Sequence, residues 1–162
     1  MKFSFNVKVK SDTKVWDKMR RNLLRGNTRA VNIGWWHSRH PTGVPVAQVA
    51  SYNEEGHYTG RNAYSPPRPF LRINFMGKIK SGEWVKQYYS DIDKIAKGVL
   101  SWRDFNRRLS KELKETLQKE ILEWNKPMNS PYTVAIKGFN DPLIHTGTMY
   151  DSIKTKIVRR GF

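Results

Sequence analysis

Hydrophobic positions in the first third of the chain follow two periods. Apolar and polar residues alternate near the N-terminus and again after residue 29, which is the period of a half-buried strand. Between these stretches Val15, Met19 and Leu23 recur every four positions, which predicts an amphipathic helix that stops near Gly26. The predicted elements of this part are a strand at 3–9, a helix from about 12 to 25, a strand at 30–36, a loop at 37–42 and a helix from about 45 to 55.

Helical periodicity dominates the rest of the sequence. Apolar residues recur every three or four positions from Pro69 to Gly98, although Ser81 and Gly82 predict a bend or break in the middle. The strongest helix starts at Ser101, an N-cap residue, and reaches about residue 125. Its apolar stripe comprises Leu109, Leu113, Leu117, Ile121 and Trp124. The other predicted elements are a loop at 57–67, a strand at 132–137, a turn at 138–142, a short helix at 146–152 and a strand at 153–158.

This order of elements predicts an α+β fold, with a small, mostly antiparallel sheet packed against long helices. The chain of 162 residues suits a single domain over 1–162. We expect its basic N-terminal region (1–40) and basic C-terminal tail (154–162) to form extensions. No stretch approaches the roughly 18 apolar residues that span a bilayer, so no membrane partner is expected.

The charge of the chain is strongly positive and uneven. The net charge is +16, and the two end regions together hold +12 of it. Such a field favours anionic partners, either nucleic acid or an acidic protein surface. The absence of cysteine excludes disulfides, thiolate metal sites and cysteine nucleophiles.

Candidate catalytic and metal-binding groups are sparse. His37 and His40 lie near one turn, but a zinc site needs three or four ligands, and His57 and His145 are distant in sequence. Exposed loop histidines are therefore the favoured interpretation. No nucleophile elbow, phosphate-binding loop or dinucleotide fingerprint is present. We predict no enzyme activity, no cofactor and no metal site.

Two further patterns have a functional and a structural interpretation. Glu112 and Lys114 match the E-x-K piece of a nuclease signature, but within a helix they point about 200° apart, which favours a solvated face. Trp35 and Trp36, flanked by basic residues, resemble a platform for single-stranded nucleic acid. We favour the alternative in which Trp35 lies in the core and Trp36 is partly exposed or at a subunit contact.

Two separated segments carry more specific motifs. Residues 46–72 contain A-x-x-x-E-x-G, from Ala50 to Gly56, and then P-x-R-P-F-L, from Pro66 to Leu71. Residues 142–153 read P-L-I-H-T-G-T-M-Y-D-S-I. Together they resemble the virion-morphogenesis and tail-completion proteins of tailed bacteriophages, which include head–tail joining and tail terminator-like subunits. The resemblance covers the helices between the segments only loosely, and it does not cover the first 40 residues.

This resemblance implies a small antiparallel sheet with a long helix, and a protein that acts by binding. It implies a homo-oligomeric ring, with a hexamer favoured, at the neck or the head-proximal end of the tail. The implied partners are other phage neck, connector and tail-tube proteins, with contact to genomic DNA in the channel. The implied location is the virion, after assembly in the host cytoplasm.

The motifs also have a physical interpretation. The prolines around Arg68 stiffen the chain, which directs Phe70 and Leu71 into the core and leaves the arginine outside for a partner. Position 145 departs from the family, which often has Asp there, so we expect Thr146 or Thr148 to cap the following turn instead. The candidate interaction residues are Trp36, Arg39, Arg68, Lys154, Lys156, Arg159 and Arg160.

Two rival functions remain open. A basic nucleic-acid-binding module would bind duplex DNA with an affinity that falls steeply as salt rises. A nuclease would depend on Glu112 and a metal ion. The structural ring subunit ranks first, the DNA-binding module second and the enzyme last.

Overall fold

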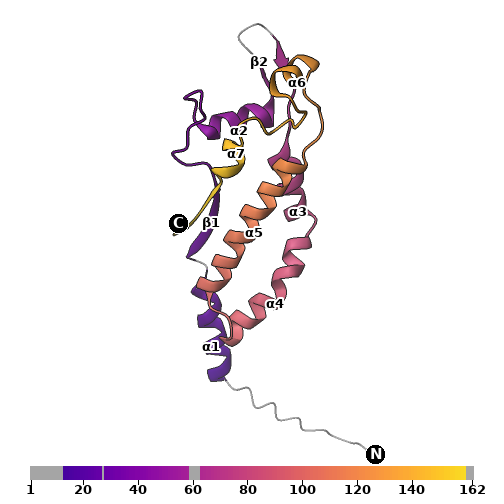
Figure 1. The fold of residues 1–162 in the computed structure, drawn as a ribbon. Helices are drawn as coiled ribbons and strands as arrows, with labels where there is room; N and C mark the ends of the chain where they lie inside the picture. The colour runs from indigo at the N-terminus through magenta and orange to yellow at the C-terminus, as the bar shows by residue number, and fades with distance from the viewer. Residues whose placement is uncertain (1–12, 27, 59–62, 160–162) are drawn as a thin grey trace, which may run out of the picture.

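The computed structural model describes residues 13–26, 28–58 and 63–159 (Figure 1). The strand predicted at 3–9, the cap residues Ser11 and Asp12, and Arg160 lie outside the described residues. The helices are α1 Thr13–Leu24, α2 Val46–Glu55, α3 Met76–Lys80, α4 Glu83–Lys97, α5 Trp102–Glu123, α6 Pro131–Lys137 and α7 Thr148–Asp151, with a π-helical segment η1 Phe70–Phe75. The strands are β1 Arg29–Gly34, β2 His57–Tyr58, β3 Tyr64–Ser65 and β4 Lys154–Arg159.

The main sheet pairs β1 with β4 in antiparallel orientation. Its register runs from Arg29 opposite Arg159 to Gly34 opposite Lys154. Strands from the two ends of the sequence are thus joined beside long helices, which confirms the predicted α+β fold. In the described parts of the two basic end regions, α1 packs against α4, and β4 completes the sheet.

Helix α5 is the long axis of the molecule. It lies between the sheet and α4, and the molecule extends along it from α1 at one end to α2 and α6 near the other (Figure 1). The predicted N-cap is confirmed, because the Ser101 hydroxyl accepts the backbone N–H of Asp104 at 3.1 Å. Leu113, Leu117 and Ile121 of the predicted apolar stripe are buried.

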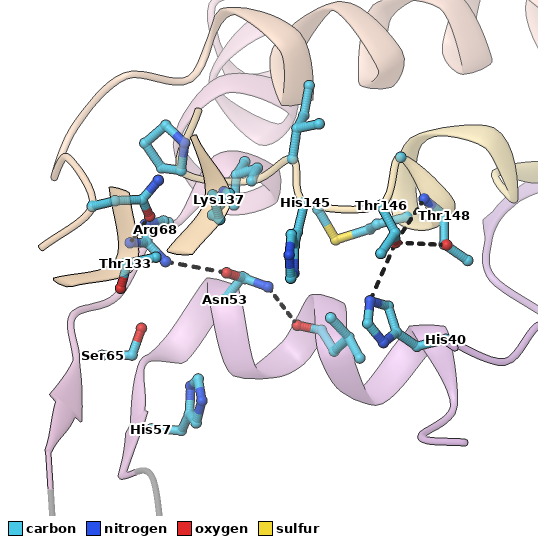
Figure 2. Close-up of a pocket in the computed structure, with 17 residues that line it drawn as sticks. His40, Asn53, His57, Ser65, Arg68, Thr133, Lys137, His145, Thr146 and Thr148 are labelled. Carbon is cyan, nitrogen blue, oxygen red and sulfur yellow. Dashed lines mark hydrogen bonds between the residues drawn. The ribbon is translucent and has the colours of Figure 1, made fainter. Parts of the chain in front are cut away.

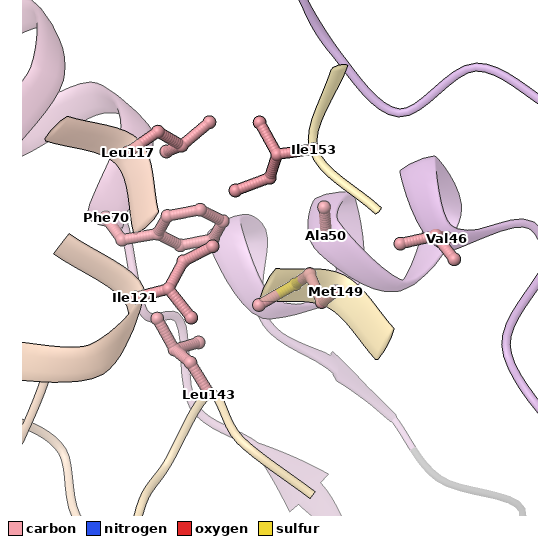
Figure 3. Close-up of a cluster of buried hydrophobic side chains, with 8 residues drawn as sticks. All are labelled: Val46, Ala50, Phe70, Leu117, Ile121, Leu143, Met149 and Ile153. Atoms are coloured by element: carbon pink, nitrogen blue, oxygen red, sulfur yellow. The ribbon is translucent and has the colours of Figure 1, made fainter. Parts of the chain in front are cut away.

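The hydrophobic core joins the two motif segments to α5 (Figure 3). Motif residues contribute most of the buried side chains, and α5 contributes two. The cluster consists of Val46, Ala50, Phe70, Leu117, Ile121, Leu143, Met149 and Ile153. The predicted core role of Phe70 is confirmed, and Leu71 and Trp35 are partly buried against the cluster.

The strand predicted at residues 132–137 is wrong, because this segment is helix α6. The Ser130 hydroxyl accepts the backbone N–H of Thr133 at 3.2 Å, and Pro131 occupies the first turn, where its missing N–H is not needed. Gly138 adopts a left-handed conformation with φ 80° and ends the helix. These start and stop signals outweigh the short apolar alternation between them.

Two predictions about the middle of the chain, residues 57–98, can also be compared with the structure. The predicted break between α3 and α4 is confirmed at Ser81 and Gly82, where the glycine has φ 72°. The predicted loop at 57–67 contains the two-residue strands β2 and β3, which pair as a short antiparallel hairpin. Among the described residues, no helix is both long and apolar enough to cross a bilayer.

Helix α1 is attached through its C-terminal end. The Asn22 side chain donates to the Ala96 carbonyl at 3.0 Å, and Trp102 Nε1 donates to the Asn22 carbonyl at 2.7 Å. Gly26 is buried against the same indole, and a Cβ there would lie 1.9 Å from the ring. No residue of α1 itself is buried, so much of its apolar stripe faces outward.

Two leucines of α5 provide a test of the core. Leu117 is 1% exposed and Leu122 is 50% exposed. We expect Leu117→Ala to lower the free energy of unfolding by about 2–5 kcal/mol, because it removes packed methyl groups and leaves a cavity. The matched variant Leu122→Ala should lower it by less than about 1 kcal/mol. Urea denaturation monitored by tryptophan fluorescence measures both, and equal losses would contradict this description of the core.

Candidate functional site

A pocket of about 370 Å³ lies where the two motif segments meet the region of α6 (Figure 2). Its basic lining residues come from five separate places in the sequence. They are His40, His57, Arg68, Lys137 and His145. Three of the four histidines of the chain, which the sequence keeps far apart, thus line one pocket.

Arg68 lies inside this pocket, so the prediction that its side chain stays outside is wrong. Its side chain is 7% exposed. The backbone N–H of Arg68 donates to the Asn53 carbonyl at 2.6 Å, which fixes the stiff proline segment against α2. The guanidinium then turns inward and donates to Asn53 Oδ1 at 3.3 Å, to Asn129 Oδ1 at 3.2 Å and to the Pro127 carbonyl at 3.4 Å.

Positive charge gathers in the pocket without a facing acid. Burial lowers the pKa of Arg68, although an arginine guanidinium stays protonated in proteins. Burial also lowers the pKa of Lys137, nearby Arg68 lowers it further, and Asp141 acts in the opposite direction. No Asp or Glu occurs among the described residues that line the pocket. The arrangement therefore presents hydrogen-bond donors and cations to whatever enters it.

The histidines are held by neighbours of different kinds. His40 Nδ1 bonds the Thr42 hydroxyl at 2.9 Å, and His40 Nε2 lies 3.3 Å from the Thr146 hydroxyl. The His57 ring stacks on Tyr52 with 4.9 Å between ring centroids. Within the described part of the chain, no three His, Asp or Glu side chains are grouped as ligands for a metal ion.

The turn of the second motif is closed by a threonine. The Thr146 hydroxyl accepts the backbone N–H of Thr148 at 3.4 Å and also bonds the Thr148 hydroxyl at 2.8 Å. Gly147 between them has φ 74°, which suits glycine. Thr146 therefore bonds the first residue of α7, whose N-cap residue, Gly147, makes no side-chain cap. His145 remains exposed on the rim of the pocket.

Glu54 of the first motif has a role that the sequence analysis missed. Its two carboxylate oxygens accept the backbone N–H groups of Leu71 and Arg72, each at 2.9 Å. These are first-turn N–H groups of η1, which have no partner within the helix. The glutamate thereby ties α2 to the segment that places Phe70 in the core. The sequence pattern that could have indicated this contact is a carboxylate in the first motif, followed by a helix that starts directly after a proline.

A second group of candidate residues gathers beside the sheet. Lys156 Nζ lies 4.9 Å from the centre of the Trp36 ring, a cation–π distance, and Lys154 Nζ lies 3.5 Å from the Trp36 carbonyl. Arg39 instead donates to the Gly43 carbonyl at 2.8 Å within its own loop. Arg159 is exposed at the far end of β4. Three of the candidate interaction residues are thus brought together.

Both tryptophans are partly buried, and Trp35 packs against the core cluster, which is close to the favoured interpretation but does not place Trp35 within the buried core. Trp35 Nε1 donates to the Met149 carbonyl at 2.6 Å, and its ring meets Phe70 edge-on at 6.3 Å. Trp36 is half-buried. The two indoles therefore do not form one exposed platform.

The E-x-K pair lies on α5, as predicted, but the expected solvated face is wrong for Glu112. Its carboxylate accepts the Tyr88 hydroxyl at 2.8 Å and Gln87 Nε2 at 2.9 Å. Burial raises the pKa of Tyr88, and the bond to Glu112 raises it further. Glu112 thus joins α5 to α4, and this contact explains the carboxylate without a metal ion.

No family model, curated protein or solved structure matches this chain. The candidate site is therefore defined by its own geometry, as two groups of side chains. The first is the basic pocket around Arg68, and the second is the lysine–tryptophan group of Trp36, Lys154 and Lys156.

Adjacent glutamates provide a test of the Glu54 contact. We expect Glu54→Gln to lower the free energy of unfolding by about 1–2 kcal/mol, because an amide offers one acceptor oxygen where two N–H groups need one each. Glu55, which is exposed on α2 and has no hydrogen bond or ion pair among the described residues, is the control, and Glu55→Gln should change stability by less than about 0.5 kcal/mol. Chemical denaturation of both variants measures the difference. Indistinguishable variants would show that the contact is not stabilising.

Proposed function

We propose that this chain is a structural subunit of a tailed bacteriophage, which forms a ring that completes the tail and joins it to the head. The observation that carries the proposal is the packing of the two motif segments into one core on α5. Six of the eight buried residues of this core come from the two motif segments, so these segments serve mainly to pack the fold together. In this proposal the motifs form a scaffold, and the surfaces that it supports bind other subunits.

Exposed apolar side chains supply a candidate surface for contact between copies. On α1, Trp16 is 65% exposed, and Val15 and Leu24 are also more than half exposed. A closed ring needs two different, complementary surfaces on each subunit, repeated by rotation. In the proposed ring, this face of α1 packs against a neighbouring copy.

The positive charge of the chain is compatible with the proposed neighbours. The net charge of +16 favours acidic neighbours in the neck, connector or tail tube, and contact with DNA in the channel. A hexamer is the favoured ring, located in the virion after assembly in the host cytoplasm. The exposed Arg159 and the lysines of β4 are the residues that we assign to these contacts.

Purified phage particles provide the test. We expect mass spectrometry to detect this chain in particles, and cryo-electron microscopy to show it as a rotationally repeated ring at the neck. We further expect Trp16→Ser to deplete the chain from particles at least about threefold, because removal of a buried interface aromatic ring weakens association.

The control for this experiment is Tyr132→Ser, which removes an aromatic side chain of similar exposure, 69%, from α6 near the other end of the molecule (Figure 1). This variant should be incorporated at the wild-type level. A wild-type chain that is absent from purified particles, or that shows no ring density at the neck, would refute the proposal.

A second candidate function, duplex DNA binding, is favoured by one observation. Lys156 lies over the Trp36 ring while Lys154 is held beside it, so two exposed cations share one side of β4. Exposed lysines at a fixed spacing neutralise phosphates and release counterions. This group could serve a free DNA-binding module or the inner face of a ring.

The salt dependence of DNA binding tests this candidate. We expect the double variant Lys154→Ala/Lys156→Ala to bind a 20-base-pair duplex more weakly and to reduce the slope of log affinity against log salt by about 2. The control is Lys111→Ala/Lys119→Ala, which removes the same charge from lysines ion-paired on α5. Fluorescence anisotropy across salt concentrations measures both slopes. Identical slopes would exclude the lysine–tryptophan group as the DNA contact.

A further inference from the structure

The buried guanidinium of Arg68 has more donors than its neighbours accept. Arginine carries five N–H groups, and three of them bond neutral oxygens at 3.2–3.4 Å. The other two have no acceptor among the described residues. Beside it, Asn129 Nδ2 is buried and also lacks a partner in the described structure. A buried donor without an acceptor is strongly unfavourable, so these groups define a place for an acceptor.

The nearby carboxylates do not meet this need. Both oxygens of Glu54 are engaged by the amides of Leu71 and Arg72. Asp141 presents its backbone carbonyl, not its carboxylate, to Lys137 Nζ at 2.6 Å. The described lining of the pocket contains cations and histidines but no acid. A buried positive charge thus lacks a counter-charge within the described part of the chain.

We propose that this pocket binds a carboxylate from an acidic segment of a protein partner. A planar guanidinium matches the two oxygens of a carboxylate, which accept two N–H groups at once. Asn129 Nδ2 supplies a further donor, and Lys137 adds charge from the same wall. Val49 and Met149 line the pocket as well and suit the methylene groups of a glutamate side chain.

Protein carboxylates fit this pocket better than DNA phosphates do. Arg68 is 7% exposed, so a ligand must enter the pocket to reach it. The volume of about 370 Å³ is small for a binding pocket and suits a side chain, whereas the phosphates of a duplex lie on a broad convex surface. The exposed lysines of β4 offer phosphates a more accessible contact. This inference is separate from the ring proposal and can hold for an isolated chain.

Two histidines allow a matched experiment. His145 lies on the pocket rim, exposed, with its ring directed into the pocket (Figure 2). In His145→Asp, a tethered carboxylate competes for the site at high effective concentration. His37 is also exposed but does not line the pocket, and its φ of 58° is one that Asp tolerates. His37→Asp therefore makes the same change of charge away from the site.

The measurement follows the side-chain N–H signals of Arg68 and Asn129 by NMR while N-acetyl-glutamate amide is added. We expect saturable shifts in the wild type and in His37→Asp, and no response to N-acetyl-glutamine amide. We expect His145→Asp to weaken binding at least about tenfold. The same variant should raise the melting temperature by about 2–4 °C, since it gives the buried cation a counter-charge, while His37→Asp should leave it unchanged.

Three outcomes would overturn the inference. The first is the absence of shifts at Arg68 and Asn129 in the wild type. The second is an equal response in the wild type and His145→Asp with no rise in melting temperature, which would locate carboxylate binding on the general basic surface. The third is a larger shift of the Arg68 signal with a 20-base-pair duplex than with the glutamate compound, which would assign the pocket to phosphate.

Discussion

The packing of Phe70 between α5 and the second motif is the contact on which the rest of the structure depends. Leu117 and Ile121 from α5, and Met149 and Ile153 from the C-terminal motif, belong to the same buried cluster (Figure 3). These side chains bury apolar surface that neither motif segment could bury alone. Because β4 follows Ile153 directly, the same packing places the last strand beside β1.

The polar site is a consequence of this packing. The prolines that bring Phe70 inward also place Arg68 against α2 and the loop at residues 127–129. Glu54 holds the start of η1, so the position of the guanidinium is set from both sides. The buried arginine and the buried phenylalanine, two residues apart, thus belong to one structural unit. Its apolar side stabilises the fold, and its polar side faces the pocket.

Much of the fold could be predicted because its signals are local. Ser101 and Gly98 mark helix ends through backbone geometry, and the stripe on α5 follows from helical periodicity. The segment at 132–137 shows the limit of this approach. Its alternation fits a short strand, yet the serine cap at residue 130 and the glycine at residue 138 stabilise a helix. A short apolar run can form either a strand or a helix, so the capping residues that flank it must also be considered.

The sequence alone determined the α+β class and the long helix. It also determined which side-chain groups the chain contains: many cationic groups, no thiols and few neighbouring carboxylates. Only the tertiary structure decided where Arg68 points and that His40, His57 and His145 share a pocket. The physical reason is the distance along the sequence over which each interaction acts. Capping and periodicity act over one or two helical turns, whereas burial of a charged side chain depends on which distant segments pack around it.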